Sequence, residues 1–321
     1  VGQEQMAAQF LGDLAAYDRL DALVRQLAEL DAHAPRTVLV SAQVASATHR
    51  FSEASALLMQ AGARGALKPD ASRLLLGIDQ ARGTRLDVVL EERRRVAERS
   101  GRLEDLVPLA ATLVDLGGYD EADRIYQQAL AGYRDASPFA VAWACFQLGV
   151  LWGEQVPVPQ PQRAAQWYAL AIAYLPGYVK ARVHLAEIHL RDGQFQAAES
   201  LLRPALSASD PEVRWRLAEV MAATGSPAQA QMQLQAARAG FDGLLESRLL
   251  AFADHGAAFY LASGNDPARA FELARINLAN RPTLRAWQLA YSTAIGAGSP
   301  QAAADLLAKA RERWGSDLKF H

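Results

Sequence analysis

Residues that carry out catalytic chemistry are few in this sequence, and none falls at the spacing of a known active site. His184 and His189 lie five residues apart, so on one helix they project about 140° apart and cannot easily share a metal ion. The stretch from His184 to His189 also differs from the HExxH zinc arrangement. Asp254 and His255 are adjacent, with no nucleophile in a recognisable frame. The remaining histidines are His33, His49 and His321.

Other reactive groups give the same result. The sequence has no glycine-rich phosphate loop and no CxxC pair. Cys145 is the only cysteine, so an intrachain disulfide is impossible and the redox compartment stays undecided. The charge run from Glu91 to Arg95 is more typical of a solvated helix face than of an anion site. We therefore predict no catalytic residue, no cofactor, no metal site and no enzymatic activity.

The overall composition predicts a folded chain that is not attracted to nucleic acid. Hydrophobic residues make up 51% of the 321 residues, and the mean hydropathy is -0.05. This is enough apolar material for a buried core. The net charge of -2 provides no basic field for phosphates, so nucleic acid is not an expected partner. No uncharged apolar stretch reaches about 18 residues, so no membrane-spanning segment is expected.

Small residues recur in a helical-repeat frame. In residues 179–207, Leu185 and Ala186 are followed by Gly193 and then by Ala198, Leu202 and Ala205. This pattern resembles the tetratricopeptide repeat family, in which small residues let two antiparallel helices approach closely. The alanine of the second helix recurs at irregular spacings of 32 to 42 residues, at Ala122, Ala164, Ala198, Ala230, Ala270 and Ala303.

The resemblance implies an all-α solenoid of about nine antiparallel helix pairs, wound as a right-handed superhelix. Residues 101–321 carry the clearer repeats, and residues 1–100 carry divergent ones such as that of Phe51, Ala54 and Leu58. We expect one continuous solenoid, although 1–100 could also form a separate cap. A proline-rich insertion between Gln155 and Pro161 interrupts one pair. It is either a stiff surface loop or a contact loop for a partner.

The family places its first helices on the concave face, which predicts the lining of a groove. The inner positions lie six and three residues before the small residue and one after it, along one helical stripe. They are largely aromatic. The predicted ligand-binding residues are Trp143, Phe146, Val150, Val183, Trp215, Phe252, Phe259, Trp287 and Tyr291. If these rings were partly exposed, the apolar surface would be large for a monomer, so a ligand, a partner or the chain's own termini should cover it. The alternative is that the rings belong to the core between repeats.

Three functions follow from this lining. The first is a non-catalytic binding protein whose groove takes an apolar partner segment, such as an amphipathic helix or an extended peptide. The second is a carrier of a small apolar molecule, for example a sterol-like or hopanoid lipid. The third is an assembly scaffold. The cellular location is unknown, but a signal peptide removed before Val1 would favour the periplasm over the cytoplasm. Arginine accounts for 29 of the 33 basic residues, which suggests a GC-rich bacterial source.

Overall fold

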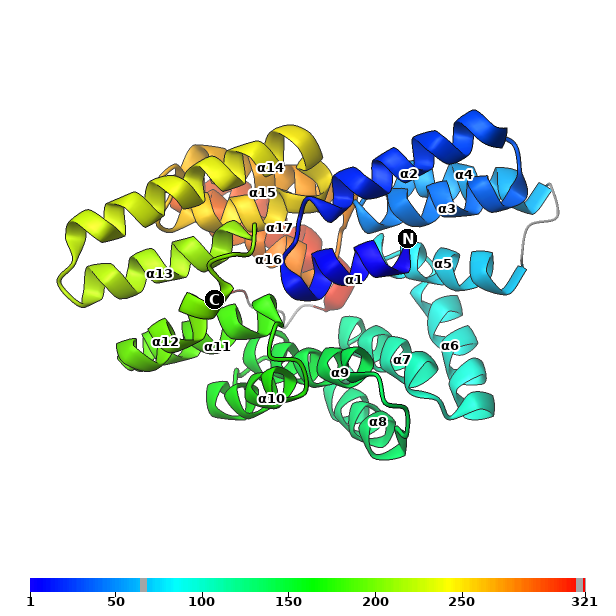
Figure 1. Cartoon of the computed structure of the whole chain (residues 1–321), viewed down its shortest axis with the longest axis horizontal. Helices are drawn as coiled ribbons and strands as arrows, with labels where there is room; N and C mark the ends of the chain where they lie inside the picture. Colours follow the sequence, from blue (N-terminus) through cyan, green and yellow to red (C-terminus); the bar gives the residue numbers. More distant parts are fainter. Residues whose placement is uncertain (64–67, 316–319, 321) are drawn as a thin grey trace. The chain divides into compact units, whose positions relative to one another are not determined.

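The chain folds into helices that pair along the sequence, as a computed structural model shows for residues 1–63, 68–315 and 320 (Figure 1). No strand occurs among these residues. The helices are α1 (Gly2–Leu11), α2 (Ala16–Asp31), α3 (Pro35–Ala47), α4 (Phe51–Ala63), α5 (Lys68–Ala81), α6 (Leu86–Ser100), α7 (Leu103–Asp115), α8 (Tyr119–Gly132), α9 (Pro138–Val150), α10 (Pro161–Tyr174), α11 (Val179–Arg191), α12 (Phe195–Leu202), α13 (Pro211–Ala223), α14 (Pro227–Leu261), α15 (Pro267–Asn280), α16 (Leu284–Gly296) and α17 (Pro300–Trp314). The prediction of an all-α helical-repeat fold is confirmed.

The alanines that mark the repeats lie where the helices cross. All six alanines of the predicted second helices are buried, with exposed fractions between 0 and 8%. Consecutive helices such as α7 and α8, α9 and α10, and α16 and α17 pack against each other. Close packing at these crossings requires a small side chain, because a larger one would separate the two backbones.

The turns within pairs share one geometry. Gly117, Gly193, Gly225 and Gly298 have φ between +67 and +81°, a region that residues with a Cβ rarely adopt. In each case the next backbone N–H donates to a carbonyl five residues earlier, for example from Gln194 to His189 at 2.8 Å. This is the closing bond of a Schellman motif, and it satisfies a carbonyl at the helix end.

Helix α14 corresponds to two helices that the sequence pattern predicts separately. Its 35 residues bend at Arg248, which has φ -146° and ψ 50°. The predicted repeats place the end of one pair before this point and the first helix of the next pair after it. The sequence pattern therefore describes two helices, 227–247 and 249–261, that join without a separating loop.

The chain divides into two compact units. Unit 1 contains residues 1–5, 17–84 and 238–321, and unit 2 contains residues 6–16 and 85–237. These boundaries follow residues 84 and 237, whereas the predicted division between weak and clear repeats falls after residue 100. The assignment of residues 1–100 as divergent repeats stays a prediction.

Unit 1 combines helices from the first and the last part of the chain. The Arg248 guanidinium donates to Asp18 at 2.5 Å and to Asp21 at 2.7 Å, both on α2. The side chain of Asn280, on α15, donates to the carbonyl of His49 at 2.9 Å. Helices from both ends of the sequence thus contact each other within one unit, which the pattern of local repeats does not predict.

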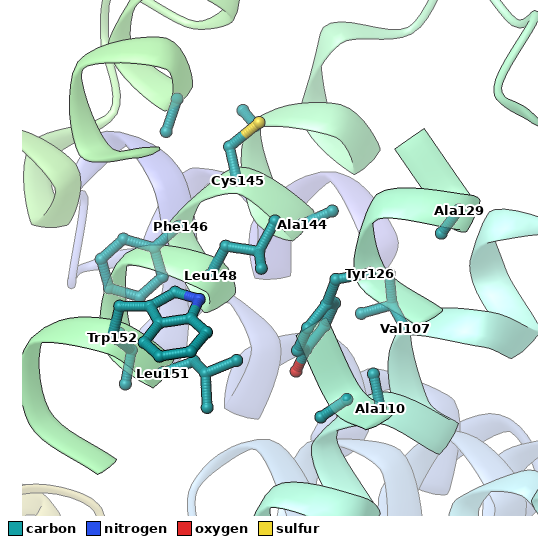
Figure 2. Close-up of a cluster of buried hydrophobic side chains, with 14 of the residues drawn as sticks. Val107, Ala110, Tyr126, Ala129, Ala144, Cys145, Phe146, Leu148, Leu151 and Trp152 are labelled. Carbon is teal, nitrogen blue, oxygen red and sulfur yellow. The ribbon is translucent and has the colours of Figure 1, made fainter. Parts of the chain in front are cut away.

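Unit 2 contains a continuous core built by α7 to α11. Figure 2 shows part of it, with Tyr126 of α8 facing Val107 and Ala110 of α7. Leu151 and Trp152 belong to the same cluster and lie on a five-residue π-helical turn, Leu151–Gln155, that follows α9.

Candidate functional site

The nine predicted ligand-binding residues are divided between the two units. Trp143, Phe146, Val150, Val183 and Trp215 lie in unit 2, and Phe252, Phe259, Trp287 and Tyr291 lie in unit 1. Five of them are buried to 6% exposure or less, namely Phe146, Val150, Val183, Trp215 and Phe259. For these five, the structure agrees with the alternative that the stripe forms core. Their role in ligand binding stays a prediction.

In the repeat that contains Phe259, the small residue at the helix crossing lies one position earlier than the sequence pattern had predicted. The prediction placed Ala258 at the crossing, but Ala258 is half-buried, whereas Ala257 is fully buried. At Gly256 an added Cβ would lie 2.9 Å from the side chain of Leu245. Shifting the frame by one residue moves Phe259 off the inner stripe and into the core, where it stacks on Phe241 at 4.6 Å.

The rings that unit 1 leaves half-buried are contacted by other parts of that unit. Phe252 packs edge-on to Tyr17 at 6.2 Å between ring centroids. Trp287 meets Trp314, the last residue of α17, at 6.4 Å. Tyr291 meets Phe320 at 5.4 Å. Residues near both ends of the chain therefore contact these predicted groove positions.

Unit 2 brings together a cluster of aromatic rings around Phe10. Phe139, Trp143 and Phe146 lie four and three residues apart on α9, so they share one face. The Phe10 ring approaches Phe139 at 5.2 Å, Trp143 at 6.3 Å and Tyr178 at 4.9 Å, each time edge-on. Phe10 itself is only 5% exposed. With Phe10 these rings belong to the buried core of unit 2. We call the set of Phe139, Trp143, Phe146 and Tyr178, which packs around Phe10, the aromatic groove.

The segment that carries Phe10 is also held by its backbone. The Ser209 amide and hydroxyl both donate to the carbonyl of Gly12, at 3.0 and 2.9 Å. The Leu14 amide donates to the Ser209 hydroxyl at 2.8 Å. Gly12 has φ +64°, and an added Cβ would lie 3.1 Å from Val179 and Ala208. The segment 6–16 therefore occupies the aromatic groove as a helix end and a tight turn with one ring inserted.

A polar pocket of about 320 Å³ lies elsewhere in unit 2. Its charged lining comes from the π-helical turn, α11 and α13. These residues are Glu154, His184, Glu187, Arg191, Arg216 and Glu219. The pocket adjoins the aromatic groove, because the His184 ring contacts Phe146 at 5.3 Å and Tyr168 at 5.3 Å. No residue of the segment 6–16 lines it.

Two glycines and a buried carboxylate set the position of Glu154. A Cβ on Gly149 would lie 2.4 Å from the Tyr168 ring, and one on Gly153 would lie 3.0 Å from Ala164. The backbone of α9 and its π-helical turn can therefore lie directly on α10. Asp123 accepts hydrogen bonds from the Trp152 indole at 2.7 Å and from Arg163 at 3.0 Å, which anchors the turn. Turns of this type are frequent at functional sites.

Carboxylates control the charges in the pocket. His184 Nδ1 lies 2.8 Å from a Glu154 oxygen, and the Arg216 guanidinium pairs with Glu187 and Glu219. Burial lowers the pKa of His184, but Glu154, Glu187 and Glu212 more than offset this and raise it above its ordinary value. The pKa of Arg216 is raised by Glu187, Glu219 and Glu212, again against the effect of burial. Both cations are only partly buried, at 18% exposure of the side chain, and the neighbouring carboxylates stabilise their charged forms.

Among the described residues, the reactive groups considered in the sequence do not form a metal site. In the part of the chain that the structure describes, no three His, Cys, Asp or Glu residues could hold a metal ion. Cys145 is buried, and burial raises its pKa to about 12, so its thiol is not a nucleophile at neutral pH. His321 lies outside the described residues. None of the described helices is both long and apolar enough to cross a membrane. The absence of enzymatic activity stays a prediction.

The polar pocket was not predicted from the sequence. His184 was considered there only as a metal ligand, and Glu154 was not connected with α11. A signal was present in α11, where His184, Glu187 and Arg191 are spaced by three and four residues and so lie on one face. The proline-rich insertion was noted, and the structure places it directly after the π-helical turn that carries Glu154. Its Val158 is 76% exposed, as a surface loop requires.

Comparison with known proteins gives similarity of structure only. No family model matches the chain, and no curated protein matches it. Among solved structures, it is similar to BtubC from P. vanneervenii (19% identity, 71% of this chain and 87% of that chain, TM-score 0.42). It is also similar to a tetratricopeptide repeat protein from Parabacteroides merdae (15% identity, 81% and 98%, TM-score 0.44). A third is the human IFIT1 dimer with m7Gppp-AAAA (15% identity, 96% and 77%, TM-score 0.44). The RNA is a feature of that protein, and the expectation that this chain binds no nucleic acid stays a prediction.

Proposed function

We propose that this chain is a non-catalytic binding protein that holds an apolar segment of a protein partner in the aromatic groove of unit 2. The observation that supports the proposal is the way the segment 6–16 lies there. Phe10 inserts among three rings, and Ser209 binds the backbone of Gly12 and Leu14. Ring insertion and backbone hydrogen bonds are the two contacts by which grooves generally recognise peptides.

The same contacts define the chemistry of the partner. It carries one aromatic residue for the groove, and two residues later it has a glycine, because the position of Gly12 leaves no room for a side chain. Aromatic anchors in desolvated pockets supply most of the affinity of such interfaces. The segment 6–16 acts as an intramolecular competitor, and a partner with better contacts replaces it.

The pocket and the groove favour a peptide over a lipid. A carrier for a sterol-like or hopanoid molecule needs an apolar cavity that encloses most of the ligand. The pocket beside the groove is instead lined by six acidic, basic or histidine side chains. The groove itself is closed around a single phenylalanine ring.

A binding titration tests the proposal. The ligand is a fluorescent peptide with the sequence of residues 6–16, and the receptors are the full chain and its Phe10→Ala variant. Fluorescence anisotropy should show saturable binding to the variant and at least tenfold weaker binding to the unchanged chain. The reason is that an intact tethered segment competes at an effective concentration on the order of millimolar.

Two controls make the titration specific. A peptide with alanine at the position of Phe10 should not bind, because it lacks the ring. The Leu30→Ala variant should behave like the unchanged chain, since Leu30 is 84% exposed. The proposal fails if the Phe10→Ala chain is folded by circular dichroism and binds neither peptide, or binds both equally.

A further inference from the structure

The turn that leads into α11 contacts the segment 6–16 residue by residue. The Tyr178 ring lies 4.9 Å from the Phe10 ring, between centroids. The next residue, Val179, lies against Gly12, where an added Cβ would be 3.1 Å from a methyl carbon of Val179. Tyr178 therefore contacts the aromatic anchor, and Val179 contacts the glycine that follows the anchor two positions later.

The residue between the anchor and this glycine is Leu11, and it lies over Gly177. An added Cβ on Gly177 would be 3.1 Å from the Leu11 Cδ2 atom, closer than the separation of about 3.5–4.0 Å that is favourable for two carbon atoms. Leu11 is 44% exposed, and Gly177 is exposed as well. This contact thus lies at the surface of unit 2, whereas the Phe10 ring is buried. A segment that replaces residues 6–16 meets Gly177 at the same place.

Hydrogen bonds hold the turn around Gly177 in place. The Tyr178 amide donates to the Leu175 carbonyl at 2.9 Å, and Arg182 Nε donates to the Pro176 carbonyl at 2.7 Å. The ring of Pro176 also fixes its own φ. Gly177 is not one of the glycines with a positive φ, so its backbone conformation is open to residues with a side chain. The missing side chain at this position therefore matters for the contact with the segment and is not required by the turn.

We propose that Gly177 is a specificity-determining residue of the aromatic groove and selects a leucine-sized aliphatic residue directly after the aromatic anchor of the partner. An alanine at this place is too short to make the contact that the tip of Leu11 makes. The partner then carries an aromatic residue, an aliphatic residue and a glycine in succession. The inference deepens the proposed function and rests on it, but the segment 6–16 also tests it inside the chain, without an external peptide.

The first test measures a preference between two peptides. Both have the sequence of residues 6–16, one with leucine and one with alanine at the position of Leu11, and the receptor is the full-length Phe10→Ala chain. In anisotropy titrations the leucine peptide should bind about fivefold more tightly, because about half of this side chain is covered. Adding Gly177→Val to the receptor should remove the preference, and Gly177→Ala should reduce it. Gly132→Ala is the matched control, since this exposed glycine has open space around an added Cβ, and it should leave the preference unchanged.

The second test uses hydrogen exchange of the Leu14 amide, which donates to Ser209 and so reports docking of the segment in the chain with Phe10 intact. Leu11→Ala should accelerate this exchange about fivefold, but it should have little effect when Gly177→Val is also present.

The proposal is overturned if Leu11→Ala leaves the exchange of the Leu14 amide unchanged. It is also overturned if Leu11→Ala has the same effect in the unchanged chain and in the folded Gly177→Ala and Gly177→Val chains, or if both of these variants keep the full preference for the leucine peptide. If neither peptide binds, the proposed function fails, and the exchange comparison still decides the role of Gly177.

Discussion

Phe10→Ala should release the segment 6–16 from the aromatic groove. A phenylalanine side chain buries about 150–250 Å², and at about 25 cal/mol/Å² this corresponds to about 4–6 kcal/mol. Alanine retains part of this burial, and core Phe→Ala changes cost about 3–5 kcal/mol. Because Phe10 is 5% exposed and meets three rings, we expect docking to weaken by about 4 kcal/mol. This is nearly three orders of magnitude in the docking equilibrium.

Amide hydrogen exchange measures this release directly. The Leu14 and Ser209 amides donate across the interface between the segment and the rest of unit 2. Their exchange should accelerate by a factor of at least 100 in the variant. Amides inside α16, in unit 1, serve as the internal reference and should not change. If Leu14 and Ser209 exchange at the unchanged rate, Phe10 does not hold the segment in place and the argument is refuted.

Two further substitutions test one buried position in each unit, Gly149 in unit 2 and His49 in unit 1. Gly149→Ala should lower the free energy of unfolding by about 1–3 kcal/mol in urea titrations, because the new methyl group would overlap the Tyr168 ring. Gly132→Ala is the control, because the added Cβ meets open space, and it should be neutral or slightly stabilising. If both substitutions change the free energy of unfolding equally, the close contact between Gly149 and the Tyr168 ring is contradicted. Burial lowers the pKa of His49 from 6.5 to about 4, so the folded chain should lose roughly 3 kcal/mol as the pH falls through this interval. Asparagine tolerates the left-handed backbone of residue 49, so His49→Asn should flatten this dependence of stability on pH. The same substitution at the exposed His33 should not. If the stability of His49→Asn depends on pH as in the unchanged chain, the pH dependence does not come from His49.

The repeat fold could be predicted because its signals are local. Ala122 and the equivalent alanines are buried at helix crossings, and Gly117 and its equivalents close the turns. The association of the first and last helices of the chain in unit 1 could not be predicted in this way. It depends on single contacts between distant residues, such as Arg248 with Asp18 and Asp21, and these have no periodic pattern.

The site was only partly predictable for a related reason. The aromatic stripe on α9 was found, and so was the need for something to cover it. Its cover, Phe10, sits in a segment without a repeat signal. The polar pocket depends on a π-helical turn that places Glu154 beside His184. A one-residue change in helix geometry of this kind alters which side chains converge, and sequence spacing assumes regular helices.

The central claim is that the aromatic groove accepts an external peptide in place of the segment 6–16. Photocrosslinking tests it most directly, with benzoylphenylalanine at the position of Phe10 in the peptide and the full-length Phe10→Ala chain as receptor. Mass spectrometry should locate the crosslinks at Phe139, Trp143 and Tyr178, and excess unlabelled peptide should suppress them. Crosslinks confined to unit 1, or spread over both units without such suppression, would contradict the claim.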